Sequence, residues 1–508
     1  MTRTGPKPGR RRDPLRICVV GAGISGLAAA WEVHTTAPDA ELVVLEAASR
    51  PGGVIRTSPF AGLVTDEAAD AFLARVDDGT RLCAELGLTD DLVAPATTRA
   101  FVHLDGRLVP FPRSQFLGVP LEPENVDSGL LSPAGRAALA ADLARPAVAP
   151  ERRDTGDQPD PTIAQAEIGH PERATTGTDC TVGELIRARL GDEVLERLVG
   201  PLVGSIHAGD CDRLSLRAAA PALAEAARRD TSLIRALRDR STAGRDGGAP
   251  PEPVFWGLRG GMETLITALV ERLSPALALD EPALALEVRP DDAGREVIRA
   301  VRTPERSIPC DAVVLAVAAT QAARLIAPLA PDTAALLAAT GTASVAIVTL
   351  AYEPSAVPGA AEGSGFLVPA TSNLAITACS WASTKWAHLG GPGSTPAVLR
   401  VSLGRHTDDA IVTESDETLV AAARAGLAAV MGISAAPTAT RVSRWPGAFP
   451  QYSVGHLQRT ATVEDTLRPA GVLCAGSSYH GIGIPACIAS GRRAARSALS
   501  VARDESRP

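Results

Sequence analysis

The sequence contains almost no lysine and few aromatic residues. Lys7 and Lys385 are the only lysines among 50 basic residues, and Phe, Trp and Tyr together make up 3% of the chain. A catalytic lysine Schiff base therefore has almost no candidate residue. Basic residues are not in excess either, because 58 acidic residues leave a net charge of −8. This balance disfavours a nucleic-acid-binding protein.

Patterns typical of metal sites, disulfide frameworks and membrane spans are also missing. The eight cysteines are scattered without a C-x-x-C spacing, so we expect free thiols, a reducing cytoplasmic setting and no metal site. No run of about 18 apolar residues occurs, so membrane contact is expected to be peripheral or absent. Residues 1–13 are basic and rich in Pro and Gly, which predicts a disordered tail rather than a secretory signal.

The chain does contain a glycine motif between a strand and a helix. Leu15–Val20 is an apolar run that predicts a buried strand, and Gly21-Ala22-Gly23-Ile24-Ser25-Gly26 follows it as G-x-G-x-x-G. An Ala-rich helix to about Thr36 and a second strand at Glu41–Leu45 complete a β-α-β unit. Glu46 ends that strand, where a carboxylate suits the ribose hydroxyls of an adenosine. Together these features predict a dinucleotide-binding fold.

Each glycine of the motif has a physical role. Gly21 allows the tight turn, Gly23 lets the backbone approach a pyrophosphate, and Gly26 lets the helix pack against the strand. The start of the helix then offers free N–H groups and a partial positive charge to the phosphates.

A second glycine pair distinguishes FAD from NAD. Residues 46–56 read E-x(3)-R-x-G-G-x-x-R, with Arg50, Gly52, Gly53 and Arg56 at fixed positions after Glu46. This segment resembles the continuation of the motif in the flavin amine oxidase superfamily. The resemblance implies that the glycines pass close to the FAD diphosphate and ribityl chain. It also implies that the arginine helps to fix the phosphates or the site.

The C-terminal region resembles the closing motif of the same superfamily. Gly471–Gly476 predicts a strand that delivers a glycine, and Ile482–Pro485 leads into a helix over Ala486–Leu499. In the superfamily, backbone amides at such a helix start face the pyrophosphate and flavin, and a small apolar residue lies against the adenine. Both ends of the chain are therefore expected to build one FAD domain. The predicted FAD contacts are Gly21, Ala22, Gly23, Ile24, Ser25, Gly26, Glu46, Ala47, Arg50, Gly52, Gly53, Val54, Ile55, Arg56, Ala283, Trp445, Ala475, Gly476, Ile482, Gly483 and Ile484.

Further segments resemble, in order, the protoporphyrinogen and coproporphyrinogen III oxidases of haem synthesis. They include Pro201–Asp210, Gly365–Pro369, Thr377–Trp381 and Pro450–His456, and the likeness extends from about residue 15 to residue 500. The resemblance implies an FAD enzyme that oxidises a small-molecule porphyrinogen with O₂ and releases H₂O₂. The substrate candidates are Arg75, Leu367 and Val368, with Arg75 as a partner for a propionate.

Several alternatives remain open at this point. The composition suggests a GC-rich, actinobacterium-like source, and the resemblance implies that relatives from such sources act before the propionates are decarboxylated. By this analogy coproporphyrinogen III is the expected substrate, and protoporphyrinogen IX is the near alternative. A ferrochelatase is expected downstream, and the oligomeric state is undetermined. Another superfamily amine oxidase or a carotenoid desaturase is a second possibility, and a non-catalytic FAD-containing porphyrin carrier is a third. No catalytic base is assigned.

Some positions depart from the superfamily pattern. Ala346 falls where the resemblance implies the lysine of amine oxidases, which argues against amine oxidation. The loop Asp66–Phe72 has Ala68 and Asp70 where the family often has Gly and Glu, so its backbone path is in question. Lys385 is expected to be structural.

The predicted fold class is α/β, with a Rossmann-like FAD-binding domain, a mixed-sheet substrate domain and a helical insertion. The predicted boundaries are 14–80, 216–318 and 441–505 for the FAD-binding domain, 81–114 and 319–440 for the substrate domain, and 115–215 for the helical insertion, which contains a flexible loop at 145–180.

Overall fold

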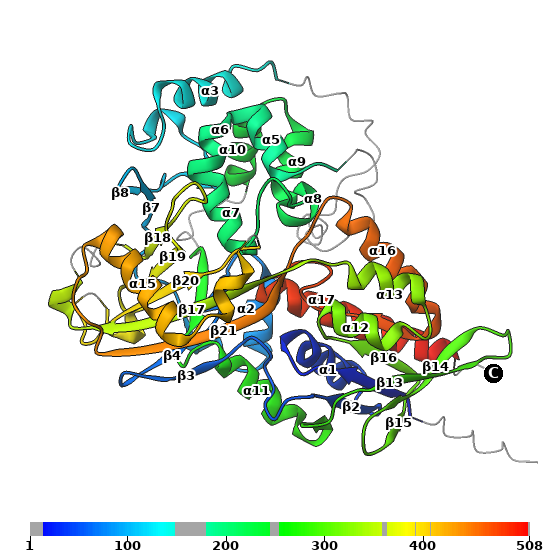
Figure 1. The fold of residues 1–508 in the computed structure, drawn as a ribbon. Helices are drawn as coiled ribbons and strands as arrows, with labels where there is room; N and C mark the ends of the chain where they lie inside the picture. The colour runs from blue at the N-terminus through cyan, green and yellow to red at the C-terminus, as the bar shows by residue number, and fades with distance from the viewer. Residues whose placement is uncertain are drawn as a thin grey trace, which may run out of the picture.

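The computed structural model describes residues 14–147, 179–243, 253–357, 363–391, 393–406 and 408–505 (Figure 1). The tail predicted at 1–13 and most of the loop predicted at 145–180 lie outside these residues. Within them the fold is α/β and combines a parallel sheet, a larger mixed sheet and a helical region, as predicted. No helix in the described part of the chain is long and apolar enough to cross a membrane. No group of His, Cys, Asp and Glu residues there could hold a metal ion.

The parallel sheet is built from both ends of the chain. Its strand order is β12-β2-β1-β16-β22, and every pairing is parallel. The strands are β1 (Arg16–Val20), β2 (Glu41–Leu45), β12 (Leu277–Ala278), β16 (Ala312–Leu315) and β22 (Val472–Cys474). The central strands consist largely of buried apolar residues because both faces of the sheet are covered. The predicted union of the two ends of the chain is therefore confirmed.

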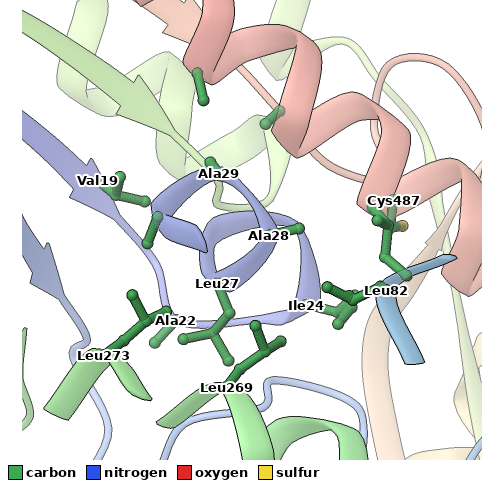
Figure 2. Packing of buried hydrophobic residues seen from close by; sticks show 14 of the residues in the cluster. Val19, Ala22, Ile24, Leu27, Ala28, Ala29, Leu82, Leu269, Leu273 and Cys487 are labelled. Carbon is green, nitrogen blue, oxygen red and sulfur yellow. The ribbon is translucent and has the colours of Figure 1, made fainter. Parts of the chain in front are cut away.

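Three helices cover one face of this sheet: α1 (Ile24–Thr36), α11 (Glu263–Leu273) and α17 (Ile484–Glu505). Figure 2 shows Leu27 of α1 directed towards Leu269 and Leu273 of α11. The alanines of α1 allow α17 to approach closely. At Gly491 of α17 an added Cβ would lie 2.0 Å from the backbone oxygen of Ser25. Small residues on both helices are therefore required at this crossing.

The other face of the parallel sheet is covered by a three-stranded antiparallel sheet and several helices. The strands are β13 (Ala285–Pro290), β14 (Glu296–Arg302) and β15 (Ser307–Pro309), and the helices are α12 (Ala319–Ile326), α13 (Pro331–Ala338) and α16 (His456–Leu467). Their apolar residues form one buried cluster with Cys18, Val20 and Leu45 of the central strands.

The second sheet has seven strands in the order β21-β17-β20-β19-β18-β7-β8. They are β7 (Ala100–Leu104), β8 (Arg107–Pro110), β17 (Thr342–Tyr352), β18 (Gly365–Leu367), β19 (Ile376–Trp381), β20 (Ala397–Leu403) and β21 (Ala439–Pro450). The β18–β7 pair is parallel and the other pairs are antiparallel, so the sheet is mixed as expected. Helix α15 (Asp416–Met431) covers this sheet with Leu419, Ala423 and Leu427.

The helical region lies at the top of Figure 1 and has its own apolar cluster. Its helices are α3 (Pro133–Leu143), α5 (Val182–Leu190), α6 (Asp192–Val194), α7 (Gly200–His207), α8 (Leu216–Ala219), α9 (Pro221–Arg229) and α10 (Leu233–Ala243). A capping box between Thr181 and Glu184 starts α5, because each side chain accepts the other residue's backbone N–H.

Short elements join these layers. They are β3 (Thr57–Phe60), β4 (Leu63–Asp66), β5 (Phe72–Leu73), β6 (Leu92–Val93), β9 (Gln115–Phe116), β10 (Val119–Pro120), β11 (Phe255–Leu258), α2 (Asp77–Glu85) and α14 (Ala382–Lys385). The division into three domains stays a prediction. At its edges, residues 216–237 pack in the helical cluster, and α12 and α13 pack on the parallel sheet.

Candidate active site

The first half of the candidate site is the N-terminus of α1. Gly23 is its N-cap, no side chain caps it, and its first turn carries no acidic residue. An added Cβ at Gly23 would meet nothing within 4 Å, so the space in front of the helix is open. By contrast, a Cβ at Gly21 would lie 2.5 Å from the Ala316 oxygen, and one at Gly26 would lie 1.8 Å from the Gly21 oxygen. Two glycines thus serve packing, and the third leaves room for a diphosphate.

Glu46 is fixed at the end of β2, beside this helix. Its Oε2 accepts the Ala22 N–H at 2.8 Å, and its Oε1 accepts the Ala48 N–H at 2.9 Å. The Glu46 carbonyl accepts the N–H of Glu281 at 2.9 Å, which brings the segment containing Ala283 to the same end of the sheet. The carboxylate keeps free acceptor positions for ribose hydroxyls.

The second glycine pair lies against the first motif. The Gly52 N–H donates to the Ala22 oxygen at 2.8 Å, and Gly23 and Gly52 form an isolated parallel bridge. A Cβ at Gly53 would lie 3.4 Å from the Gly23 Cα, and Gly53 has a positive φ of +57°. The structure therefore brings the two predicted glycine motifs into direct contact.

The two predicted arginines of this segment have partners within the protein. Arg50 donates to the carbonyl oxygen of Gly53 at 2.6 Å and to that of Ile55 at 3.3 Å, so it braces the loop. Arg56 pairs with Glu67, with 3.1 Å between Nε and Oε1. Both arginines are thus held near the glycine pair by their own contacts.

The second half of the site is the turn between β22 and α17. Gly476 has a φ of +122°, and its N–H donates to Ser490 Oγ at 3.1 Å. An added Cβ there would find Ser25 Oγ of α1 as its nearest neighbour, at 3.8 Å. A Cβ at Gly483, immediately before α17, would meet only Pro485, at 3.9 Å. Two helix N-termini from opposite ends of the chain therefore border the same region.

Other predicted contacts can reach a cofactor only in part. The side chains of Ala22, Ile55 and Ala475 are buried, so only their backbone atoms could face a ligand. The Val54 side chain, in contrast, is 48% exposed beside the glycine pair. Trp445 on β21 donates its indole N–H to the Glu67 oxygen at 3.1 Å.

The loop Asp66–Phe72 is fixed by buried polar contacts. Asp66 accepts the Met262 N–H at 2.8 Å and the Thr57 hydroxyl at 2.6 Å, and burial raises the pKa of Asp66 to about 6. Glu67 accepts hydroxyls from Ser58 and Ser443. Burial opposes its ionisation, but these hydrogen bonds and the nearby arginines lower the pKa of Glu67.

Asp70 holds the backbone of the altered loop Asp66–Phe72 in place. Its carboxylate lies 3.1 Å from Lys385 Nζ and 3.2 Å from Arg400 Nη1, and it accepts the Trp386 indole N–H at 3.0 Å. Burial opposes ionisation, but Lys385 and Arg400 outweigh it and lower the pKa of Asp70. Arg400 also donates to the Ala68 oxygen. The rare Lys385 thus has the structural position that was expected of it.

The substrate candidates lie on separate elements. Arg75 follows β5, and its guanidinium carbon lies 5.0 Å from the centroid of the Phe116 ring. Leu367 is half-buried at the end of β18, whereas the Val368 side chain is 2% exposed and belongs to the core behind the seven-stranded sheet. Only the backbone of Val368 could therefore face a ligand.

Sequence reasoning missed the side chains that hold the closing turn. The Gly481 N–H donates to the Tyr452 hydroxyl at 2.9 Å, and His480 pairs with Glu464 at 2.7 Å. Tyr452 lies inside the Pro450–His456 segment, whose resemblance was visible, but nothing in its spacing indicated a contact with a turn near residue 480.

This arrangement defines a class of protein. Two helix N-termini, two glycine pairs and an acidic residue at the end of β2 are the elements of an FAD-binding Rossmann-like fold. The chain belongs to the flavin containing amine oxidoreductase family, which it matches over residues 24–499. It is therefore a flavin-dependent oxidoreductase, and its cofactor is FAD.

Relatives within this family carry more specific names. The chain is 35% identical to coproporphyrinogen III oxidase of Mycobacterium tuberculosis over 96% of its own length and 98% of the relative's. It is 32% identical to the enzyme of that name in Bacillus subtilis, over 95% and 98%. The crystal structure of a protein from Exiguobacterium sp. 255-15, provisionally named a protoporphyrinogen oxidase, superimposes with a TM-score of 0.78 at 29% identity, covering 96% of this chain and 100% of that one.

Proposed function

We propose that the protein oxidises coproporphyrinogen III to coproporphyrin III, with O₂ as the electron acceptor and H₂O₂ as the second product. The observation that carries this proposal is the similarity over nearly the whole chain to relatives named coproporphyrinogen III oxidase. Bound FAD supplies the two-electron redox chemistry, and the protein supplies binding, orientation and exclusion of water.

The cofactor contacts follow from the glycine positions. We assign the diphosphate to the free N–H groups at the start of α1, beside Gly23 and Gly53, and to the start of α17 after Gly483. These positions have the space that a phosphate needs, because an added Cβ would meet nothing closer than 3.4 Å. Glu46 would hold the adenosine ribose, and the exposed Val54 would be covered by the cofactor.

The substrate end is assigned to Arg75. Surrounding protein desolvates this guanidinium, and nearby Arg240 adds a like charge; both lower the pKa of Arg75, although its side chain remains accessible to solvent. An accessible arginine next to a second cation and an aromatic ring is a receptor for a carboxylate. Coproporphyrinogen III carries four such groups, two more than protoporphyrinogen IX.

The competing functions make different demands on the site. Amine oxidation is disfavoured because Ala346 of β17 stands where the superfamily lysine was expected, and Lys385 is paired with Asp70. A non-catalytic carrier was suggested by the altered loop Asp66–Phe72. The contacts of Asp70 fix that loop without the family's glycine, so they remove the reason for this alternative.

The test is oxidation by purified, FAD-loaded protein in air. Coproporphyrinogen III and protoporphyrinogen IX are supplied separately, and porphyrin fluorescence and O₂ consumption are followed together. We expect a fluorescence increase and O₂ uptake with coproporphyrinogen III at the lower KM. No increase with either substrate contradicts the proposal, and activity with protoporphyrinogen IX alone favours the alternative.

Arg75→Gln tests the substrate end. Loss of a charged hydrogen-bond partner should raise the KM for coproporphyrinogen III on the order of tenfold, with FAD content unchanged. Arg302→Gln, on the exposed face of β14, is the matched control and should behave like the wild type. Equal KM values in all three proteins would show that Arg75 does not bind the substrate.

The setting and partners are proposals of the same kind. We place the protein in the cytoplasm, with its porphyrin product passing to a ferrochelatase. The absence of a membrane-spanning helix in the described residues is compatible with this setting. Cell fractionation with an antibody to the chain tests it.

A further inference from the structure

The backbone conformation of the turn Gly476–Gly483 is not stabilised by the residues of the turn alone. Gly476 has a φ of +122° and Gly481 a φ of +131°, and both belong to the region that side chains rarely adopt. The turn lies between β22 and α17 and contains no regular element of its own. Its shape must therefore be set by contacts from elsewhere in the chain.

Tyr452 supplies two of those contacts with one atom. Its hydroxyl donates to the Ser477 oxygen and accepts the Gly481 N–H at 2.9 Å, so it joins the two sides of the turn. The side chain is 1% exposed. A phenylalanine would fill the same space, but it would leave the partly buried Ser477 carbonyl and Gly481 N–H without this partner.

His456 adds a third contact from the same segment. Its Nε2 donates to the Tyr479 oxygen at 2.9 Å. Its ring is stacked on the Tyr452 ring, with 4.1 Å between the centroids and 22° between the planes. Burial lowers the pKa of His456 to about 4, so the stacked ring is neutral at pH 7. The two side chains form a single rigid brace.

The same segment is tied to the helical region. The Tyr452 carbonyl accepts the Ser215 N–H at 2.7 Å, and the Gln451 side-chain amide donates to the His207 oxygen at 2.8 Å. The Gly455 N–H donates to Asp179 at 3.2 Å. The segment Gln451–His456 therefore contacts the helical region through two backbone groups and the Gln451 side chain, and contacts the closing turn through the side chains of Tyr452 and His456.

We propose that Tyr452, supported by His456, is a positioning residue that sets the closing turn Gly476–Gly483 for FAD and links it to the helical region. Neither side chain contacts the cofactor in this assignment. Both act through the backbone of the turn, whose Gly483 and following helix start we assign to the diphosphate. The inference depends on those cofactor contacts and not on the identity of the substrate.

The test is FAD affinity of the full chain, measured by titrating apoprotein with FAD and following flavin fluorescence. Tyr452→Phe should weaken binding on the order of tenfold, because two partly buried backbone groups of the turn lose their partner. It should also shift the visible flavin spectrum. Tyr352→Phe removes the hydroxyl of another buried tyrosine, on β17 away from the turn, and should keep wild-type affinity.

A purely structural role for Tyr452 gives a different result. In that case thermal unfolding of the Tyr452→Phe apoprotein would occur at a lower temperature, with wild-type FAD affinity and spectrum in the folded fraction. That outcome overturns the proposal. Wild-type protein that binds FAD but oxidises neither porphyrinogen would count against the proposed function instead, so the two failures are distinguishable.

A second pair of variants applies if Tyr452→Phe does not fold. His456→Gln keeps an N–H donor for the Tyr479 oxygen, whereas His456→Leu keeps only the volume. We expect FAD affinity close to wild type for the glutamine variant and several-fold weaker for the leucine variant. Equal affinity in both variants and the wild type would contradict the positioning role.

Discussion

The two halves of the proposed FAD site are built in different ways. The half at α1 is fixed by glycine backbone, since Gly21 and Gly26 pack where no Cβ fits. The closing turn and the loop Asp66–Phe72 are instead held by buried side chains from distant segments, among them Tyr452 and Lys385. In the half built from glycine backbone, we expect a substitution either to abolish folding or FAD binding or to have no effect. In the half held by side chains, we expect each substitution to reduce stability or FAD affinity by a limited amount.

The largest expected effect is at Gly26. In Gly26→Val the new Cβ would overlap the Gly21 oxygen, with 1.8 Å between them, so α1 would have to move away from β1. We expect a loss of more than about 4 kcal/mol in the free energy of unfolding and no folded protein. Soluble yield and circular dichroism check this. A folded, FAD-loaded variant would show that the packing role is wrong.

Gly23→Val separates cofactor binding from folding within the same motif. An added Cβ there meets no protein atom within 4 Å, so we expect the apoprotein to fold with nearly unchanged thermal stability. The valine would fill the space assigned to the diphosphate, and we expect FAD binding to weaken on the order of 100-fold or more. Flavin absorbance of the purified protein measures this, and normal flavin content would contradict the assignment.

Lys385→Met tests the part of the site held by side chains. It leaves the buried Asp70 carboxylate with Arg400 as its remaining charged partner, at the cost of about 3 kcal/mol in the free energy of unfolding. The protein should still fold, and Lys385→Arg should recover part of the loss. Urea denaturation of the three proteins decides the point. An unchanged midpoint in Lys385→Met would mean that the ion pair contributes nothing.

The smallest effect concerns pH and Asp66. The folded protein holds this proton to about pH 6, above the ordinary value of 3.8, so the contribution of Asp66 to stability is full below about pH 4 and is lost as pH rises through 6. The change is at most about 3 kcal/mol, from about 1.4 kcal/mol per pH unit. Asp66→Asn should remove this slope from urea-denaturation midpoints measured at pH 4 to 7. An identical slope in both proteins would exclude Asp66 as its source.

The same division explains what the sequence could predict. The β-α-β unit and the packing roles of Gly21 and Gly26 could be predicted because local sterics and short spacings determine them. The role of Gly23 at the diphosphate stays a prediction. The capping box at Thr181 is equally local. These features need only the residues next to them.

The side-chain contacts could not be predicted because their partners are far apart in sequence. Asp70 and Lys385 are separated by 315 positions, and Asp70 first stood out only as a departure from a family pattern. Tyr452 similarly looked like part of a motif, with no sign of the turn that it holds. Such pairs come into contact only in the folded protein, and nothing in a single sequence indicates which two residues will meet.

The order of strands in the parallel sheet has a consequence for biosynthesis. Strand β1 lies at the centre and is complete after 20 residues, but β22 and the start of α17 follow only at residues 472–484. The emerging chain must therefore wait until residues 312–315 for β16 to pair with the free side of β1, and until residues 472–474 for β22 to complete the sheet. In the proposed site the start of α17 also binds the diphosphate, so we expect FAD to bind only after these last elements have been translated.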